Sequence, residues 1–198
     1  VGNAADVLIE LAGGNYSRAS EELEKVTVYV GADDAIRDVD VRAVVVPSRE
    51  WSIWKLIDSI VAGNVPEAFR QLRTLFTSSS KIEDQAFRTL FPMMSRQLRM
   101  LWQARVCIEA GAAPKSAPDD VRAMFPTQYS LEKANDFVVQ NAMRTAKNID
   151  LEQLSKCFQI LNDADGRIKG LLSSFSGIET IESMVLEMVD VVKRKSAA

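Results

Sequence analysis

Apolar residues recur at helical spacing along almost the whole chain. One stretch has an apolar residue at every third or fourth position, which places these side chains on a single face of a helix. They are Trp51, Trp54, Ile57 and Val61. No run of residues alternates between apolar and polar with the period of two that a half-buried strand requires. The pattern therefore predicts an all-α fold.

Glycine and proline divide this pattern into separate helices, since glycine readily adopts the left-handed conformation that ends a helix and proline cannot continue one. The longest expected helix contains Pro92. A kink is expected there, because proline removes one backbone hydrogen bond and crowds the preceding turn. The expected helices span about residues 3–12, 16–30, 34–46, 51–62, 66–76, 81–110, 119–125, 130–147, 150–172 and 178–194.

The helical pattern changes register at residues 46–48, where the sequence Val-Pro-Ser interrupts it. Two helical units are therefore expected, one over residues 1–46 and a larger one over residues 48–198. The chain begins with Val1 and continues as if inside a helix. We interpret it as a piece of a longer protein.

The composition removes several kinds of chemistry. The 198 residues are 47% hydrophobic and carry a formal net charge of −3, so no overall field attracts the chain to nucleic acid or to an anionic membrane. Histidine, the commonest general base and metal ligand near neutral pH, is absent. Cys107 and Cys157 lie far apart in apolar helical surroundings, which indicates reduced thiols in a cytoplasmic protein. No catalytic, cofactor-binding or metal site is expected, and no apolar run approaches the ~20 residues of a membrane span.

The most suggestive charged feature is a basic ridge on the longest expected helix. Residues 86–107 contain no acid but contain Arg88, Arg96, Arg99 and Arg105. The favoured interpretation is a solvated face, or a set of ion pairs with neighbouring helices. The alternative is a surface for phosphates or for an acidic partner, which would make the chain a helical nucleic-acid-binding or adaptor module.

Two further features lie near the C-terminus. Asp165 and Lys169 have the i,i+4 spacing and the order of a helix-surface ion pair. Phe175 lies in a serine-rich turn, where no helical stripe can accommodate it. Its ring either packs under the turn or, if exposed, could stack on a nucleic-acid base.

Several short motifs occur in the order found in the bacterial DNA polymerase III delta subunit, which this sequence resembles over nearly its whole length. They are LAGGN at 11–15 with ELEK at 22–25, SIWKLIDSI at 52–60 with GN at 63–64, RQLRML at 96–101, and LNDAD at 161–165 with Lys169 and later IE at 181–182. Two positions depart from the family pattern. Pro92 lies in a helix that the family keeps smooth, and Ile181 replaces the usual leucine.

The resemblance implies a clamp loader subunit of the replicative DNA polymerase III holoenzyme, which places the sliding clamp on primed DNA. Residues 1–46 would be the end of the helical lid domain, and residues 48–198 would be the collar-type helical bundle through which subunits oligomerise. The implied partners are delta-prime and the ATPase subunits. The family binds the sliding clamp through an N-terminal domain that this chain would lack, and contacts primed DNA through the assembled complex. The resemblance implies no catalysis, no cofactor and a cytoplasmic location.

Overall fold

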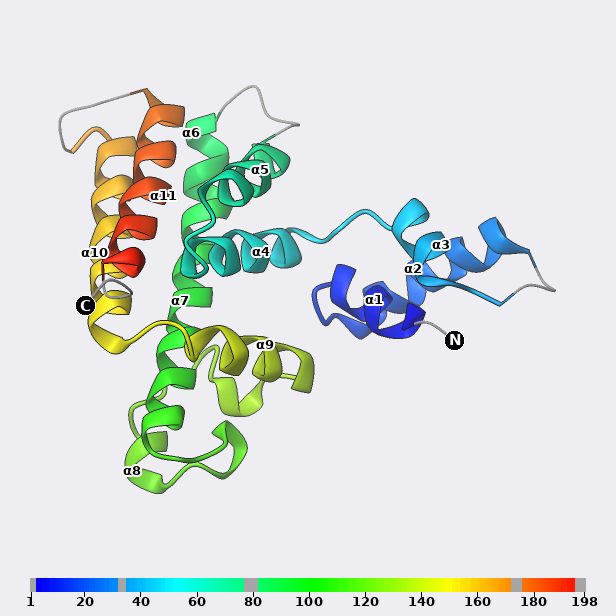
Figure 1. The fold of residues 1–198 in the computed structure, drawn as a ribbon, viewed down its shortest axis with the longest axis horizontal. Coiled ribbons are helices and arrows are strands. Elements are labelled where there is room, and N and C mark those ends of the chain that lie inside the picture. The colour runs from blue at the N-terminus through cyan, green and yellow to red at the C-terminus, as the bar shows by residue number, and fades with distance from the viewer. Residues whose placement is uncertain (1–2, 32–34, 77–81, 172–175, 195–198) are drawn as a thin grey trace. The chain divides into compact units, whose positions relative to one another are not determined.

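Every regular element of the described chain is helical. The structure is a computed structural model, and it describes residues 3–31, 35–76, 82–171 and 176–194. The elements in these residues are α-helices with short 3₁₀ and π segments (Figure 1), which confirms the expected all-α fold. The chain divides into two compact units, Val1–Ser52 and Ile53–Ala198. Each unit is described by itself.

The first unit contains three helices that pack on one another: α1 (Ala4–Leu11), α2 (Tyr16–Val30) and α3 (Asp38–Val44). Asn15 caps α2 as expected, because its side-chain oxygen accepts the Arg18 backbone N–H at 3.1 Å. The third helix begins at Asp38, later than expected, and residues 32–34 lie outside the described chain. The helices share a small buried core that includes Val7, Leu8, Leu11, Ala19, Val26 and Val41.

The turn after α1 contacts the start of α4 (Arg49–Val61). The Ser48 backbone N–H donates to the Leu11 carbonyl at 2.8 Å, and the Ser48 hydroxyl accepts the Trp51 backbone N–H at 3.1 Å. Gly13 follows α1 with φ +69°, and a Cβ built on it would lie 2.5 Å from Ser48 Oγ. Glycine at position 13 therefore allows both the left-handed turn and the close approach of Ser48.

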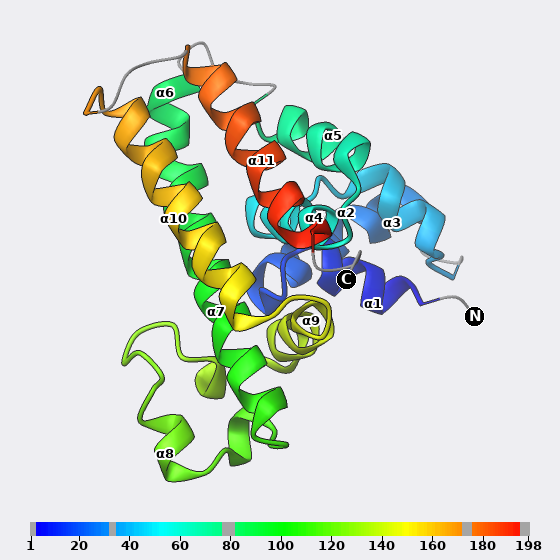
Figure 2. The same ribbon diagram turned by 60° about the vertical axis from the view of Figure 1, so that its left-hand side comes forward.

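The second unit is built around the long helix α7 (Phe91–Glu109). Both views show α10 (Leu151–Ile168) lying along α7 and beside α11 (Gly177–Lys193), while α9 (Asp136–Ala146) packs on α7 (Figures 1 and 2). Helix α5 (Val65–Phe76) packs against α11. The fully buried large side chains of this unit are Trp54, Ile53, Leu56, Ile57, Leu72, Met94, Leu101, Leu131, Leu154, Ile181, Met184 and Met188.

The helix that contains Pro92 is interrupted by a π-helical turn. Helix α6 (Ile82–Gln85) leads into the π segment η1 (Ala86–Leu90), and α7 follows directly. In this turn the Phe91 backbone N–H donates to the Ala86 carbonyl, five residues earlier. Because Pro92 has no N–H and its ring crowds the preceding turn, the wider π turn accommodates it without ending the helix. The irregularity expected at Pro92 is thus present as a π turn.

The helix expected from residue 130 begins only at Asp136, so the earlier part of that prediction is wrong. The preceding segment contains the 3₁₀ turn η3 (Leu131–Lys133), after which Asn135 caps α9 by accepting the Val138 backbone N–H at 2.9 Å. The Leu131 backbone N–H donates to the buried Gln103 side-chain oxygen at 2.7 Å. This tertiary hydrogen bond competes with continuous helix over residues 130–135. The 3₁₀ turn η2 (Pro114–Ser116) and α8 (Asp119–Arg122) complete the elements.

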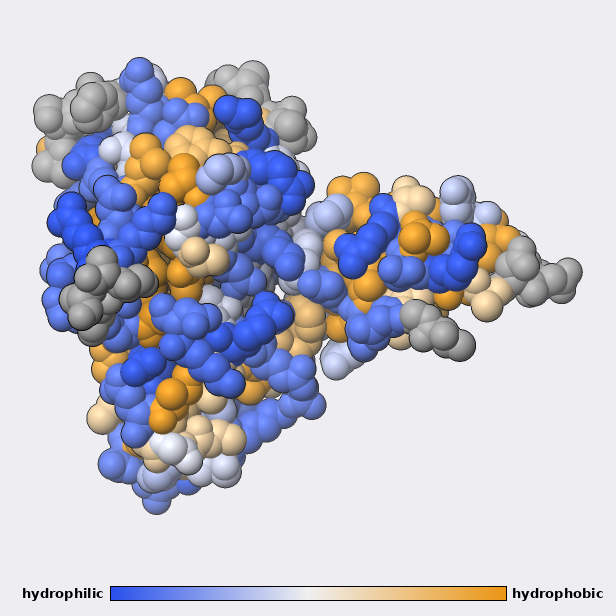
Figure 3. Space-filling model, viewed as in Figure 1, coloured by the Kyte–Doolittle hydropathy of each residue, from blue (hydrophilic) through white to orange (hydrophobic). Residues whose placement is uncertain are grey.

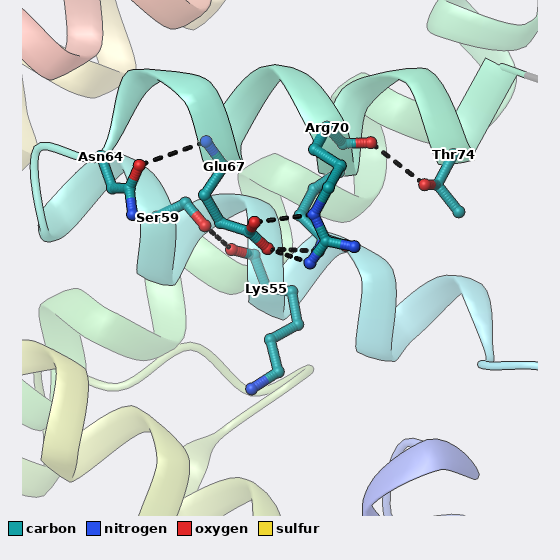
Figure 4. Close-up of polar contacts among 7 residues, drawn as sticks. Lys55, Ser59, Asn64, Glu67, Arg70 and Thr74 are labelled. Atoms are coloured by element: carbon teal, nitrogen blue, oxygen red, sulfur yellow. Dashed lines mark hydrogen bonds and ion pairs between the residues drawn. The ribbon is translucent and has the colours of Figure 1, made fainter. Parts of the chain in front are cut away.

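The corner between α4 and α5 is closed by a local polar network (Figure 4). The Asn64 side-chain oxygen accepts the Glu67 backbone N–H at 3.2 Å, which caps α5. The Glu67 carboxylate accepts two hydrogen bonds from Arg70, at 2.6 and 2.7 Å, and one from Gln71 at 2.7 Å. The Arg70 hydrogen bond, followed by that of Gln71, lowers the pKa of Glu67 to about 2.

Replacement of Gly13 by alanine should destabilise the protein more than the same change at Gly111. Both glycines have positive φ, +69° and +63°, but a Cβ at position 111 would meet nothing within 4 Å. We expect Gly111→Ala to cost about 1–2 kcal/mol of unfolding free energy through backbone strain. Gly13→Ala should cost at least about 1 kcal/mol more through the contact with Ser48. Denaturant titration followed by circular dichroism measures both, and equal losses would contradict the close approach.

The low pKa of Glu67 should make its contribution to stability depend on pH. Because the folded-state pKa lies below the ordinary value of 4.5, this contribution is present above pH 4.5 and is lost as the pH falls toward about 2. Arg70→Ala should raise the pKa of Glu67 toward 4.5, which NMR titration of the carboxyl measures. Arg73→Ala, at an exposed arginine on the same helix, is the control and should leave the pKa of Glu67 unchanged.

Candidate partner-binding groove

The four arginines of the predicted ridge have different surroundings. Arg88, in the π turn, donates to Asp84 at 2.6 Å, and this hydrogen bond raises the pKa of Arg88. Arg105 donates to Glu109 at 2.9 Å. The Arg96 guanidinium lies over an aromatic ring, 4.5 Å from the centroid of Tyr129. The two ion pairs are local i,i+4 pairs along the helix itself, and neither is the predicted ion pair with a neighbouring helix. Phe175 lies outside the described residues.

Arg99 differs from the other three. Its side chain is exposed, and within the described chain it makes neither a hydrogen bond nor an ion pair with another side chain. Arg88 and Arg99 line the same groove, whereas Arg105 lines a separate pocket with Lys55 and Arg144. The structure therefore brings two of the predicted arginines together and places Arg105 elsewhere.

The groove that Arg88 and Arg99 line runs between η1–α7 and α10, and we call it the α7–α10 groove. Its volume is ≈ 760 Å³. The apolar side chains that line it are Phe87, Phe91, Pro92, Phe158 and Leu161. An adjoining pocket of ≈ 380 Å³ shares Arg99 and Phe158 and adds Trp102 and Met124. Together they form a continuous surface of aromatic and basic side chains.

Two of the three basic side chains that line the α7–α10 groove are paired with carboxylates, Arg88 with Asp84 and Lys169 with Asp165. Lys169 donates to Asp165 at 2.5 Å, which confirms the predicted i,i+4 pair. The Lys169 ammonium also lies 5.0 Å from the centroid of the Phe87 ring. Arg88, Arg99 and Lys169 thus line the groove against one carboxylate, that of Asp165. Phe87 is 48% exposed, which is unusual for a phenylalanine.

A larger polar pocket of ≈ 900 Å³ lies near the start of α10, and most of its charged groups already have partners. Asp58 accepts hydrogen bonds from Arg144 at 3.2 Å and from the Thr145 hydroxyl at 2.5 Å. The Asp150 carboxylate accepts the Gln153 backbone N–H at 2.8 Å and so caps α10. This pocket is therefore held together by structural contacts, and we do not take it as the functional site.

Residues suited to catalysis or metal binding do not gather in the described chain. Its cysteine, aspartate and glutamate side chains form no group of three that could hold a metal ion. Cys107 and Cys157 are free and buried. None of the helices in the described ranges is both long and apolar enough to cross a membrane. On the face drawn in Figure 3, hydrophobic residues are interspersed with hydrophilic ones.

Comparisons with known proteins place this all-helical chain in a family. Residues 50–176, well over half of the chain, match the family described as DNA polymerase III delta subunit, C-terminal domain. The chain therefore belongs to this family, as its motifs indicated.

Two relatives extend the comparison beyond the matched domain. The DNA polymerase III subunit delta of Bacillus subtilis (strain 168) is 25% identical over 166 residues, which cover 84% of this chain and 43% of the relative. A solved structure of the Bacillus subtilis DNA clamp loader delta protein has the same fold, with a TM-score of 0.73 and 22% identity. That match covers 94% of this chain and 50% of the other. This chain spans about half the length of these relatives or less.

The sequence indicated Arg88 and Arg99 as candidate contact residues, but it did not indicate the apolar side chains that line the groove with them. Phe158 falls at core spacing with Leu154 and Leu161, yet it is only partly buried and lines the groove. Trp102 also falls at core spacing with Leu98 and Leu101, yet it is partly exposed and lines the adjoining pocket with Arg99. The one available signal was Phe87, next to Arg88 in a segment without acids.

Both thiols should be unreactive in the folded protein. Burial raises the pKa of Cys107, and it raises the pKa of Cys157 to about 12, so neither forms a thiolate near neutral pH. We expect a colorimetric disulfide reagent to modify neither cysteine in buffer and both in denaturant. Rapid modification of either thiol in buffer would show that its helix opens locally.

Proposed function

We propose that this chain is the assembly part of a clamp loader delta subunit. The observation that carries the proposal is the family match over residues 50–176. We assign residues 1–46 to the end of the lid domain and residues 48–198 to the collar. In this role the chain joins delta-prime and the ATPase subunits in the cytoplasm. Their complex places the sliding clamp on primed DNA.

The geometry supports a scaffold better than a catalyst. Helix α10 packs on both α7 and α11, the α7–α10 groove lies beside it, and the described side chains form no group of three that could hold a metal ion. A rigid helical body can hold ATP-driven neighbours in register without taking part in their chemistry. We therefore infer an accessory, non-enzymatic role.

Direct nucleic-acid binding by this chain is the second candidate, and the arrangement of charges weighs against it. Arg88 and Arg105 are paired with carboxylates, and Arg96 packs on Tyr129. The net charge is −3. Phosphate binding needs several cations that are free to replace counterions, and of the four ridge arginines Arg99 alone lacks a partner among the described residues.

The proposal is tested by size-exclusion chromatography with light scattering, on the chain mixed with delta-prime and the ATPase subunits of its own clamp loader. We expect one larger particle that contains all of the subunits. The same chain should bind primed DNA weakly when alone. Failure to join the particle, together with DNA binding that falls steeply with salt, would instead favour the nucleic-acid-binding module.

A further inference from the structure

The α7–α10 groove combines an aromatic surface with Arg99, which has no hydrogen-bond or ion-pair partner among the described side chains. Phe87, Phe158 and Trp102 leave apolar surface in water, which is unfavourable unless another molecule covers it. Arg99 lies where the groove and its adjoining pocket meet, because it lines both. The groove therefore presents an apolar contact surface with a positive charge at its centre.

We propose that this groove receives an acidic amphipathic helix from a neighbouring clamp loader subunit. The inference rests on the proposed function and adds to it a docking surface and the chemistry of its partner. A helix-in-groove interface needs an apolar stripe on the incoming helix and a complementary groove on the receptor. Here Arg99, which makes no side-chain hydrogen bond or ion pair within the described chain, favours a partner helix that carries an aspartate or a glutamate.

The length of the groove suits a helix of moderate size. From Phe87 to Trp102 the lining residues follow the chain for fifteen positions, or roughly 20 Å at about 1.5 Å per residue. An incoming helix of about four turns would cover this distance. Its apolar residues, spaced three and four apart, would contact Phe87, Phe158 and Trp102 in succession.

Arg99 gives the interface its specificity. A guanidinium has five N–H donors in a planar fork that matches a carboxylate, and those of Arg99 are unused by neighbouring side chains. A carboxylate near the middle of the incoming helix would take a bidentate pair with Arg99 while apolar contacts on both sides exclude water. A nucleic-acid backbone would satisfy the arginine and leave most of the aromatic surface exposed.

Charge reversal at Arg99 tests the inference in the full chain and the assembled complex. Because Arg99 is exposed, Arg99→Glu should leave the fold intact by circular dichroism. We expect it to weaken assembly at least about tenfold, since it replaces the central attraction by repulsion. Arg73→Glu makes the same change in charge at an exposed arginine on α5, outside the groove, and should change assembly less than about twofold. Equal effects of the two variants would overturn the inference.

A photo-crosslinking residue in place of Phe87 identifies what occupies the groove. In the assembled complex we expect crosslinks to an acidic helical segment of a neighbouring subunit, located by mass spectrometry. Crosslinks to a second copy of this chain, to DNA or to nothing, in a complex that still forms, would overturn the groove assignment and leave the proposed function standing. If the unmodified chain does not join the complex at all, both the groove inference and the proposed function are wrong.

Discussion

The packing of α10 along α7 is the contact on which the second unit depends. It buries residues from both helices, among them Met94, Leu101 and Leu154, and it sets the spacing between the two helices. Helix α11 packs on α10, and α9 packs on α7. The same pair of helices therefore forms both the core and the groove. Side chains that point between α7 and α10 are buried, and those at the outer edge line the groove.

The π turn before Pro92 places two of its residues in the lining of the groove. It inserts an additional residue into one turn of the helix and so rotates the preceding segment relative to α7. Phe87 and Arg88 lie within this turn, and both line the groove with Pro92. π turns of this kind occur frequently at functional sites. Pro92, two residues after this π segment, thus lines the same groove as the exposed Phe87 side chain.

Pairing within the chain, and not burial, separates the charged groups that maintain the fold from those available to a partner. Asp58, Glu67 and Asp150 are engaged by caps and nearby basic or hydroxyl groups. Such contacts stabilise individual turns by modest amounts, since most are exposed to solvent. Arg99 has no such role inside the described chain. A desolvated pair with a partner would give it a larger energetic effect than any of these surface pairs.

The sequence alone determined the helical fold, most helix positions, the Asn15 cap and the Asp165–Lys169 pair, because spacing and capping act within a few residues of chain. Its motifs also indicated the family. Only the tertiary structure decided that Arg88 and Arg99 meet Phe158 at one groove while Arg105 lies elsewhere. It also decided that Gln103 holds Leu131 outside a helix. These outcomes depend on contacts between residues far apart in sequence, and helical periodicity carries no information about which helices meet.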